Sequence, residues 1–394
     1  MKLNKLLITD LILIILVSGC SSSTSNDKIR NISPLLAIQN KFTPIKLWTS
    51  TIKEEKENIY SKLHPASSNK TIYIANRYGI IKALSSCDGK EKWKIDLSEH
   101  TNLFSKNIPA LLSGGLAVNK NHIYVGTERA KIFSIHTIDG SIEWEKNVAG
   151  EVLSSPVISD NMLLVHTSNG ILQALDKHNG FIKWSINLDK PTLSLRGESE
   201  PTIKFKTIIL GSDNGYISAI NINDGQMIWQ KKITKPHGSS TIDQLKDIDS
   251  SPLIINGIIY ALAYNGNLTA LTIESGQILW ERNIGSAHDI ISDGTKVFLV
   301  EKNDCLTAVS LEKGTKMWQQ SDLLYRKLTP PILYNGYLVV GDQQGYLYWI
   351  NPNTGKIISQ NQIDKTGFIS KPIISSENLL ILQSKIGQVT AIKN

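Results

Sequence analysis

The stretch Ala219-Ile220-Asn221-Ile222-Asn223-Asp224-Gly225-Gln226-Met227-Ile228-Trp229 contains the pattern that decides the fold. A small residue precedes the glycine by six positions, and a tryptophan follows it by four. The glycine–tryptophan spacing recurs at Gly89–Trp93, Gly140–Trp144, Gly180–Trp184, Gly276–Trp280 and Gly314–Trp318, and Gly355–Ser359 is a copy without the tryptophan. The copies contain β-rich runs, and most have a turn such as Ser168-Asn169-Gly170. Such runs joined by Asn-Gly turns are typical of hairpins, so each copy predicts four short antiparallel strands.

The spacing of the copies predicts how these units assemble. Successive tryptophans from Trp48 to Trp318 lie 38 to 51 residues apart. A four-stranded unit of this size cannot bury both faces alone, whereas units packed radially bury one another. The last copy stops at Asn394 before its outer strand, and residues 45–50 offer an outer strand without a preceding copy. We therefore predict an all-β, eight-bladed β-propeller of four-stranded antiparallel blades, with the N-terminal strand closing the last blade.

The glycine and the tryptophan of each copy have structural explanations. Glycine permits the backbone geometry of a tight turn into the last strand. Tryptophan offers a large apolar area, which we expect to pack between neighbouring blades and not to stack a ligand.

Composition excludes several classes of protein. The 394 residues are 41% apolar and 20% charged, which is incompatible with wholesale disorder. No apolar run reaches the roughly 18 residues of a membrane-spanning helix. The net charge of +7 is spread along the chain without a basic block, so no nucleic-acid partner is expected. Cys87 and Cys305 fall in different units and form no Cys-x-x-Cys pair, so neither a disulfide nor a redox motif is expected.

The first twenty residues are typical of an export signal. Lys2 and Lys5 precede an apolar run that ends in Leu16-Val17-Ser18-Gly19-Cys20. This ending resembles a bacterial lipobox, which implies lipidation of the Cys20 thiol and cleavage just before it; an ordinary signal peptide is the alternative. Ser21 follows the cysteine, which in such signals implies sorting to the outer membrane. We expect a signal peptide at 1–19, the lipidated cysteine with a flexible tether at 20–40, and the propeller at 41–394.

Motifs for catalysis and metal binding are absent from the sequence. It contains no G-x-S-x-G, H-E-x-x-H or phosphate-binding loop. No two of the eight histidines have a helical ligand spacing, and the acidic residues gather at turns, where they can bond their own backbone. We therefore expect no catalytic residue, no metal site and no cofactor.

Two long connections are the best candidates for a functional site. They join Trp184 to Pro201 and Trp229 to Pro252, over 17 and 23 residues, and should emerge on the same face of the ring. The first contains Leu193, Leu195 and Arg196, a composition typical of protein interfaces. The second contains Asp247 and Asp249. The alternative is that Arg196 forms ion pairs with these aspartates and so joins the two loops, with the leucines buried beneath them.

Several segments go beyond the generic repeat. The spacing of small residue, glycine and tryptophan resembles the repeat first associated with PQQ-dependent dehydrogenases, which speaks to the fold alone. A closer resemblance, over residues 35 to 394, is to the BamB family, lipoprotein subunits of the outer-membrane β-barrel assembly (BAM) complex. The segments that carry it are 63–66 (LHPA), 109–115 (PALLSGG), 166–170 (HTSNG), 193–199 (LSLRGES), 261–271 (ALAYNGNLTAL) and 345–351 (GYLYWIN). Ser359, in place of a tryptophan, departs from the pattern.

The resemblance implies a scaffold subunit and not an enzyme. In that family, the equivalent loops contact the periplasmic POTRA domains of BamA. By position, the implied contact residues are Leu193, Leu195, Arg196, Asp247 and Asp249. The implied location is the periplasmic face of the outer membrane, with the other BAM subunits reached through BamA. Two alternatives are a propeller lipoprotein of another envelope complex and a PQQ-dependent dehydrogenase.

A second hypothesis concerns client proteins. Each blade has an exposed outer edge strand, and an unfolded β-barrel strand could pair with it.

Overall fold

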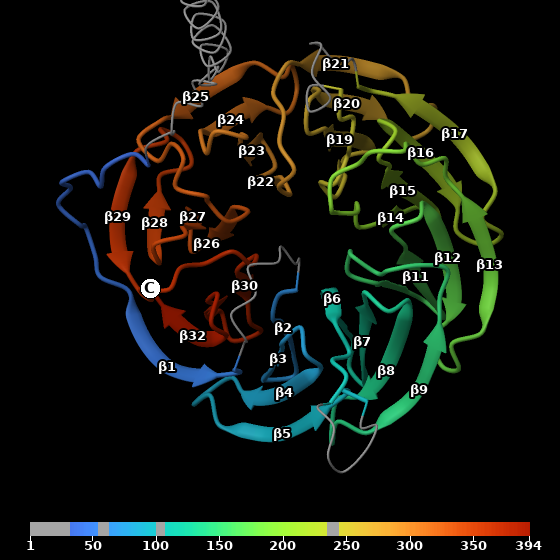
Figure 1. Cartoon of the computed structure of the whole chain (residues 1–394). Coiled ribbons are helices and arrows are strands. Elements are labelled where there is room, and N and C mark those ends of the chain that lie inside the picture. Colours follow the sequence, from blue (N-terminus) through green and yellow to red (C-terminus); the bar gives the residue numbers. More distant parts are fainter. Residues whose placement is uncertain (1–31, 54–62, 100–106, 235–243) are drawn as a thin grey trace, which may run out of the picture. The chain divides into compact units, whose positions relative to one another are not determined.

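The computed structural model describes residues 32–53, 63–99, 107–234 and 244–394. The chain divides into two compact units, Met1–Ile32 and Ser33–Asn394. The second unit is a ring of eight four-stranded sheets (Figure 1), and every pairing within a sheet is antiparallel. The described residues contain no helix, and therefore none that could cross a membrane. The predicted eight-bladed propeller is confirmed.

The blades are numbered in chain order, and the strands of each run outward from the centre of the ring (Figure 1). Blades 1 to 4 comprise β2 (Ala66–Ser68), β3 (Thr71–Ala75), β4 (Ile80–Ser85), β5 (Glu91–Asp96); β6 (Leu112–Val118), β7 (His122–Thr127), β8 (Lys131–His136), β9 (Ile142–Asn147); β10 (Val157–Ser159), β11 (Met162–His166), β12 (Ile171–Asp176), β13 (Ile182–Asn187); and β14 (Thr202–Lys204), β15 (Thr207–Gly211), β16 (Tyr216–Asn221), β17 (Met227–Lys232). Blades 5 to 8 comprise β18 (Leu253–Ile255), β19 (Ile258–Leu262), β20 (Leu268–Thr272), β21 (Ile278–Arg282); β22 (Ile291–Ser292), β23 (Lys296–Val300), β24 (Leu306–Ser310), β25 (Lys316–Gln320); β26 (Ile332–Tyr334), β27 (Tyr337–Gly341), β28 (Tyr346–Ile350), β29 (Ile357–Gln362); and β30 (Ile373–Ile374), β31 (Leu380–Gln383), β32 (Gln388–Lys393), β1 (Ile45–Thr51).

Blade 8 is built from both ends of the described chain. β1 pairs with β32 from Ile45↔Lys393 to Thr51↔Gln388, so the N-terminal strand supplies the outer strand of the last blade. This arrangement confirms the predicted closure, and it leaves no gap in the ring at the junction of the two ends.

The hydrophobic core is a series of layers between blades. Each buried cluster takes its side chains from two neighbouring blades, as in the layer of Leu164 and Leu172 with Ile208 and Ile220. Middle strands such as β7 are buried along their whole length because a blade covers each face, whereas outer strands such as β13 alternate between exposed and half-buried residues. The repeated apolar runs of the sequence therefore form the middle strands.

The glycine and tryptophan of the repeat join one blade to the next. The indole nitrogens of seven tryptophans each donate to a backbone carbonyl of the following blade, at 2.7 to 3.1 Å. A β-carbon added at Gly140 would lie 2.6 Å from Cε3 of Trp93, and Gly140 also has a positive φ of 77°. Glycine is thus required both for the turn, as predicted, and for the close approach of the neighbouring tryptophan.

The junction of blades 7 and 8 uses a different arrangement. Trp349 occupies the position of the small residue and faces Ser359, which occupies the position of the tryptophan. The large and small side chains have exchanged places. Phe42, from the segment before β1, packs edge-on against Trp349, with ring centroids 5.7 Å apart. The Ser359 hydroxyl donates to the Phe42 carbonyl oxygen at 2.6 Å, so the N-terminal segment completes this junction.

Candidate functional site

The two long connections meet beside blades 3 to 5. One lies between β13 and β14 and the other between β17 and β18. The backbone N–H of Leu195 donates to Oδ1 of Asp247 at 2.6 Å, and a β-carbon added at Gly197 would lie 2.7 Å from Oδ2 of Asp249. The predicted residues therefore come together, with the aspartates of the second connection against the backbone of the first.

Burial divides the five predicted residues into two groups. Leu193 is 52% exposed, Arg196 is exposed and Leu195 is half-buried. Asp247 and Asp249 are 0% and 4% exposed, so neither can touch a partner in this conformation. The expectation of direct contact by the two aspartates needs correction. They lie beneath the loop, where the Asp247 carboxylate accepts the Leu195 N–H and Asp249 packs against Gly197.

Arg196 has different partners from those predicted. Its guanidinium lies 2.8 Å from Oε2 of Glu128 and 3.4 Å from Oε2 of Glu151, and not against the two aspartates. Arg77 also binds Glu128, through two bonds of 2.9 Å. Burial opposes ionisation of Glu128, but the two arginines hold its pKa below the ordinary value. Sequence reasoning missed Glu128 because the ring, not the chain order, places blade 2 beside this loop.

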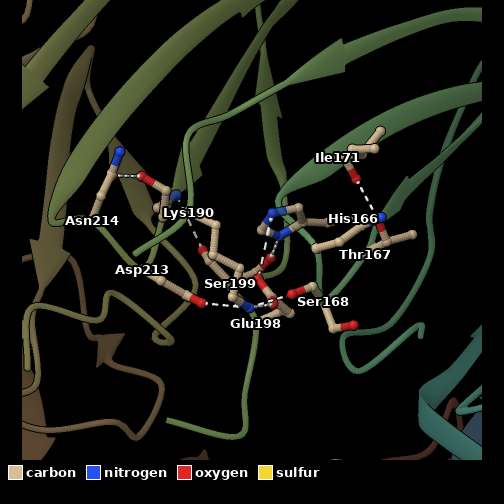
Figure 2. A network of polar contacts seen from close by, with 12 residues as sticks. His166, Thr167, Ser168, Ile171, Lys190, Glu198, Ser199, Asp213 and Asn214 are labelled. Atoms are coloured by element: carbon tan, nitrogen blue, oxygen red, sulfur yellow. Dashed lines mark hydrogen bonds and ion pairs between the residues drawn. The ribbon is translucent and has the colours of Figure 1, made fainter. Parts of the chain in front are cut away.

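A buried polar network supports the base of the loop (Figure 2). Lys190 lies 2.7 Å from Oδ2 of Asp213 and 3.2 Å from Oε1 of Glu198. On the other side, Nε2 of His166 lies 3.4 Å from Oε2 of Glu198, and Nδ1 of His166 lies 3.1 Å from the Ser199 carbonyl oxygen. The carbonyl oxygen requires a proton on Nδ1. Nε2 of a neutral His166 is then an acceptor, and it faces the Glu198 carboxyl group.

Burial makes two carboxyl groups of the site weak acids. Burial and then the Asp213 carboxylate raise the pKa of Glu198 to about 9, against the opposing effect of Lys190. Burial also raises the pKa of Asp247 to about 6, although the Leu195 N–H favours its ionised form. Glu198 is therefore protonated at neutral pH, which fits its position opposite His166.

Two groups of side chains in the described residues bring ligand-type atoms within 4.8 Å of one another. They are Asp213, Asp247 and Asp249, and His122, His136 and Glu143. In the first group, the Lys190 ammonium at Asp213 already supplies a positive charge. The second group lies at the opposite end of β7 from Glu128 and is separate from the loop.

A pocket lies at the centre of the ring and takes lining residues from every blade. Its polar lining includes Glu200, His288, Asp289 and Lys371. The Lys371 ammonium lies 3.0 Å from Oδ2 of Asp289, and Oδ1 of Asp289 accepts the backbone N–H of Ser251. These contacts give the pocket a structural role in holding the inner ends of blades 5, 6 and 8 together.

Cys20, the predicted lipidation site, lies outside the described residues.

Comparison with known proteins places the fold in a class. The chain resembles the crystal structure of BamB from Moraxella catarrhalis with a TM-score of 0.77 and 24% identity, covering 89% of this chain and 100% of that one. It also resembles a europium-containing methanol dehydrogenase with a TM-score of 0.68 and 13% identity, covering 86% and 84%. At these identities the likeness shows the fold alone, which is the propeller described above.

Sequence comparison then identifies the family. The model of the family described as "Outer membrane protein assembly factor BamB" matches residues 100–320, more than half of the chain. The proteins of that name from Escherichia coli K12 and Yersinia pestis are 48% and 47% identical, and the alignments cover 100% and 99% of both chains. The chain belongs to the BamB family. The family expected from the quoted segments is confirmed, and its named members are assembly factors, not enzymes.

Proposed function

We propose that the chain is a non-enzymatic scaffold subunit of the machinery that folds and inserts β-barrel proteins into the outer membrane. We infer further that its segment Leu193–Arg196, called here the docking loop, binds the POTRA domains of BamA. Full-length relatives with near 50% identity and that assembly role in their names support the first part. The exposure of Leu193 and Arg196 on a loop held from beneath is the observation that carries the second.

The docking loop combines two kinds of contact. Leu193 and Leu195 provide an apolar surface, and the Arg196 guanidinium provides planar donors for a carboxylate or for backbone carbonyls. Glu128 and Glu151 hold Arg196 from one side. A partner that approaches from the other side meets an arginine whose geometry is already set, which lowers the entropy lost on binding.

Asp247 and Asp249 act on the partner through the docking loop. Asp247 fixes the backbone at Leu195, and Asp249 packs against Gly197. Their removal is therefore expected to weaken binding by loosening the loop, without the loss of a direct contact.

Attachment to the membrane is a separate part of the proposal. Lipidation of Cys20 would hold the propeller at the periplasmic face of the outer membrane, and two acyl signals are enough for stable anchoring. BamA would then bring the chain into contact with the other BAM subunits. Co-purification from solubilised outer membrane tests this role: recovery with a different envelope complex and without BamA would contradict it.

Substitution in the docking loop tests the site. Leu195→Ala and Arg196→Ala should each weaken binding to BamA by about 2 kcal/mol, or roughly 30-fold, because truncation of interface anchors typically costs this much. Leu279→Ala is the matched control, since Leu279 is 46% exposed on the outer strand β21. Binding is measured by pull-down and surface plasmon resonance. If both loop variants bind BamA like the wild type, the site is wrong even if the family role is right.

A further inference from the structure

Three ligand-type side chains meet at one end of blade 2. His122 is the first residue of β7 and His136 is the last residue of β8, and the two are directly paired across the strands. Glu143 lies in β9 at a β-bulge, where the pairing passes from Ser134↔Trp144 to Ile135↔Ile142 and leaves Glu143 as the extra residue. Bulges re-aim side chains, and this one brings a carboxylate to the two imidazoles.

The separations are close to those of a metal site. Nε2 of His122 lies 3.0 Å from Oε2 of Glu143, and the two imidazole centroids are 5.0 Å apart. One ligand atom from each of the three residues lies within 4.8 Å of the others. Ligands at the ordinary zinc distances of ~2.0–2.2 Å in a tetrahedral arrangement are roughly 3.3–3.6 Å apart. Small side-chain rotations would therefore complete the geometry.

The surroundings also fit a bound ion. The His122 side chain is 10% exposed and the Glu143 side chain 29%, so an ion could enter from solvent toward a fixed imidazole. The Ser134 hydroxyl donates to Oε2 of Glu143 at 3.2 Å and orients the carboxylate. Such outer contacts are common behind metal ligands.

In the two blades on either side of blade 2, the equivalent bulge residue is a lysine that reaches a polar side chain of the paired positions. In blade 1 the paired positions are Thr71 and Ser85, and the bulge residue is Lys92, whose ammonium lies 2.6 Å from Oγ1 of Thr71. Blade 3 likewise has a lysine at the bulge: Met162 pairs with Asp176, and the bulge residue Lys183 lies 3.1 Å from Oδ2 of Asp176. Blade 2 replaces the lysine by a carboxylate and adds two imidazoles.

We propose that His122, His136 and Glu143 bind one divalent transition-metal ion, with zinc the expected ion. Two imidazoles and one carboxylate are a set that zinc accepts, and hard ions such as magnesium or calcium prefer oxygen ligands alone. Water fills the fourth position on the solvent side. The ion would tie β7, β8 and β9 together at the end where blade 2 faces away from the docking loop.

Metal titration of the full chain tests this site. After treatment with EDTA, the protein should take up one equivalent of zinc in isothermal titration calorimetry. His136→Ala and the isosteric Glu143→Gln should each weaken zinc binding at least about tenfold, because loss of even an outer-shell partner of a metal ligand costs roughly 10- to 100-fold. Circular dichroism confirms that each variant is folded. Absence of zinc uptake, or unchanged affinity in both variants, would overturn the proposal.

Cysteine is the main competing ligand, and two further measurements address it. Cys87 is exposed, so Cys87→Ser is the control and should leave zinc binding unchanged. Cobalt(II) in the site should show visible ligand-field bands without the near-ultraviolet charge-transfer band of a thiolate. A thiolate band that disappears in Cys87→Ser would assign the metal to the cysteine and refute the site on blade 2.

Discussion

Glu198, a buried residue beneath the docking loop, should make the free energy of unfolding depend on pH. Its pKa is about 9 in the folded chain, well above that of an exposed glutamate, so folding takes up a proton between about pH 4.5 and pH 9. The folded state then binds more protons than the unfolded state, and the free energy of unfolding must fall as the pH rises through this window. The slope for one proton is at most about 1.4 kcal/mol per pH unit.

Replacement of Glu198 by glutamine should flatten this dependence. The neutral amide keeps a donor for His166 and cannot ionise. Urea unfolding at pH 6.5, 7.5 and 8.5 should show a smaller loss of stability with pH in Glu198→Gln than in the wild type. Asp247, with a pKa of about 6, should still destabilise the variant as the pH rises from about 4 to 6. An unchanged slope above pH 6.5 would show that Glu198 is ionised in the folded chain.

Gly197 determines how closely the docking loop approaches its support. An added β-carbon would lie 2.7 Å from Oδ2 and 2.8 Å from Cγ of Asp249, a buried side chain with little room to move. Gly197→Ala should therefore displace the loop, cost about 1–3 kcal/mol of stability and weaken binding to BamA. Gly150→Ala is the control, since its nearest contact is the Asn169 side chain at 3.0 Å. Equal BamA affinity in both variants would show that the loop position is unimportant.

At the level of the elements, the glycine of each repeat both adopts a positive φ and lets the neighbouring indole approach. These two effects can be measured separately, because Gly336, a hairpin glycine outside the repeat position, has only the positive φ. Gly314 has a φ of 63°, and an added β-carbon would lie 2.5 Å from Cε3 of Trp280; Gly336 has a φ of 79° with nothing within 4 Å. Gly336→Ala should cost about 1–2 kcal/mol from backbone strain alone. Gly314→Ala should cost about 1–3 kcal/mol more from the clash with the indole. Equal urea midpoints for the two variants would argue against the close packing between blades 5 and 6.

The elements could be predicted from the sequence because each blade is local. Pairings such as Ala174↔Trp184 join residues only ten positions apart, and the same pattern recurs in seven copies of the repeat. The contacts between connections could not be predicted in this way. Arg196 reaches Glu128 because the ring brings blade 2 to the loop after blade 3. The sequence also could not predict the burial of Asp247, since an aspartate in a connection usually indicates a solvated turn.

At the level of the whole molecule, the ring also assembles the site. Glu128 of blade 2 binds both Arg196 and Arg77 of blade 1, while Asp247, just before blade 5, holds the Leu195 backbone. The docking loop thus depends on chain segments from the first to the fifth blade. Opening of the ring would disturb this arrangement even if every blade kept its strands.

Closure of the ring rests on β1 and can be tested by its removal. A chain that lacks residues 45–51 loses the partner of β32 and the Trp48 indole bond to the Ser86 carbonyl. The exposed β32 edge should then pair with a second chain, because unpaired edge strands drive self-association. We expect a dimer or larger species in light scattering after size exclusion, together with a lower urea midpoint.

The matched control for this deletion removes a neighbouring segment, residues 33–40, which is hydrogen-bonded to the ring but is not part of a blade. Residues 33–40 lie along blade 7, where Asn40 exchanges bonds of 2.9 Å with the Gln360 backbone and the Ser33 N–H donates to the Leu324 carbonyl. A chain without this segment loses exposed hydrogen bonds and the bond of 2.7 Å from the buried Arg326 guanidinium to the Ser33 carbonyl, but it keeps β1 on β32. It should therefore stay monomeric. A monomer of wild-type stability after removal of residues 45–51 would mean that the seven complete blades hold the ring without the N-terminal strand.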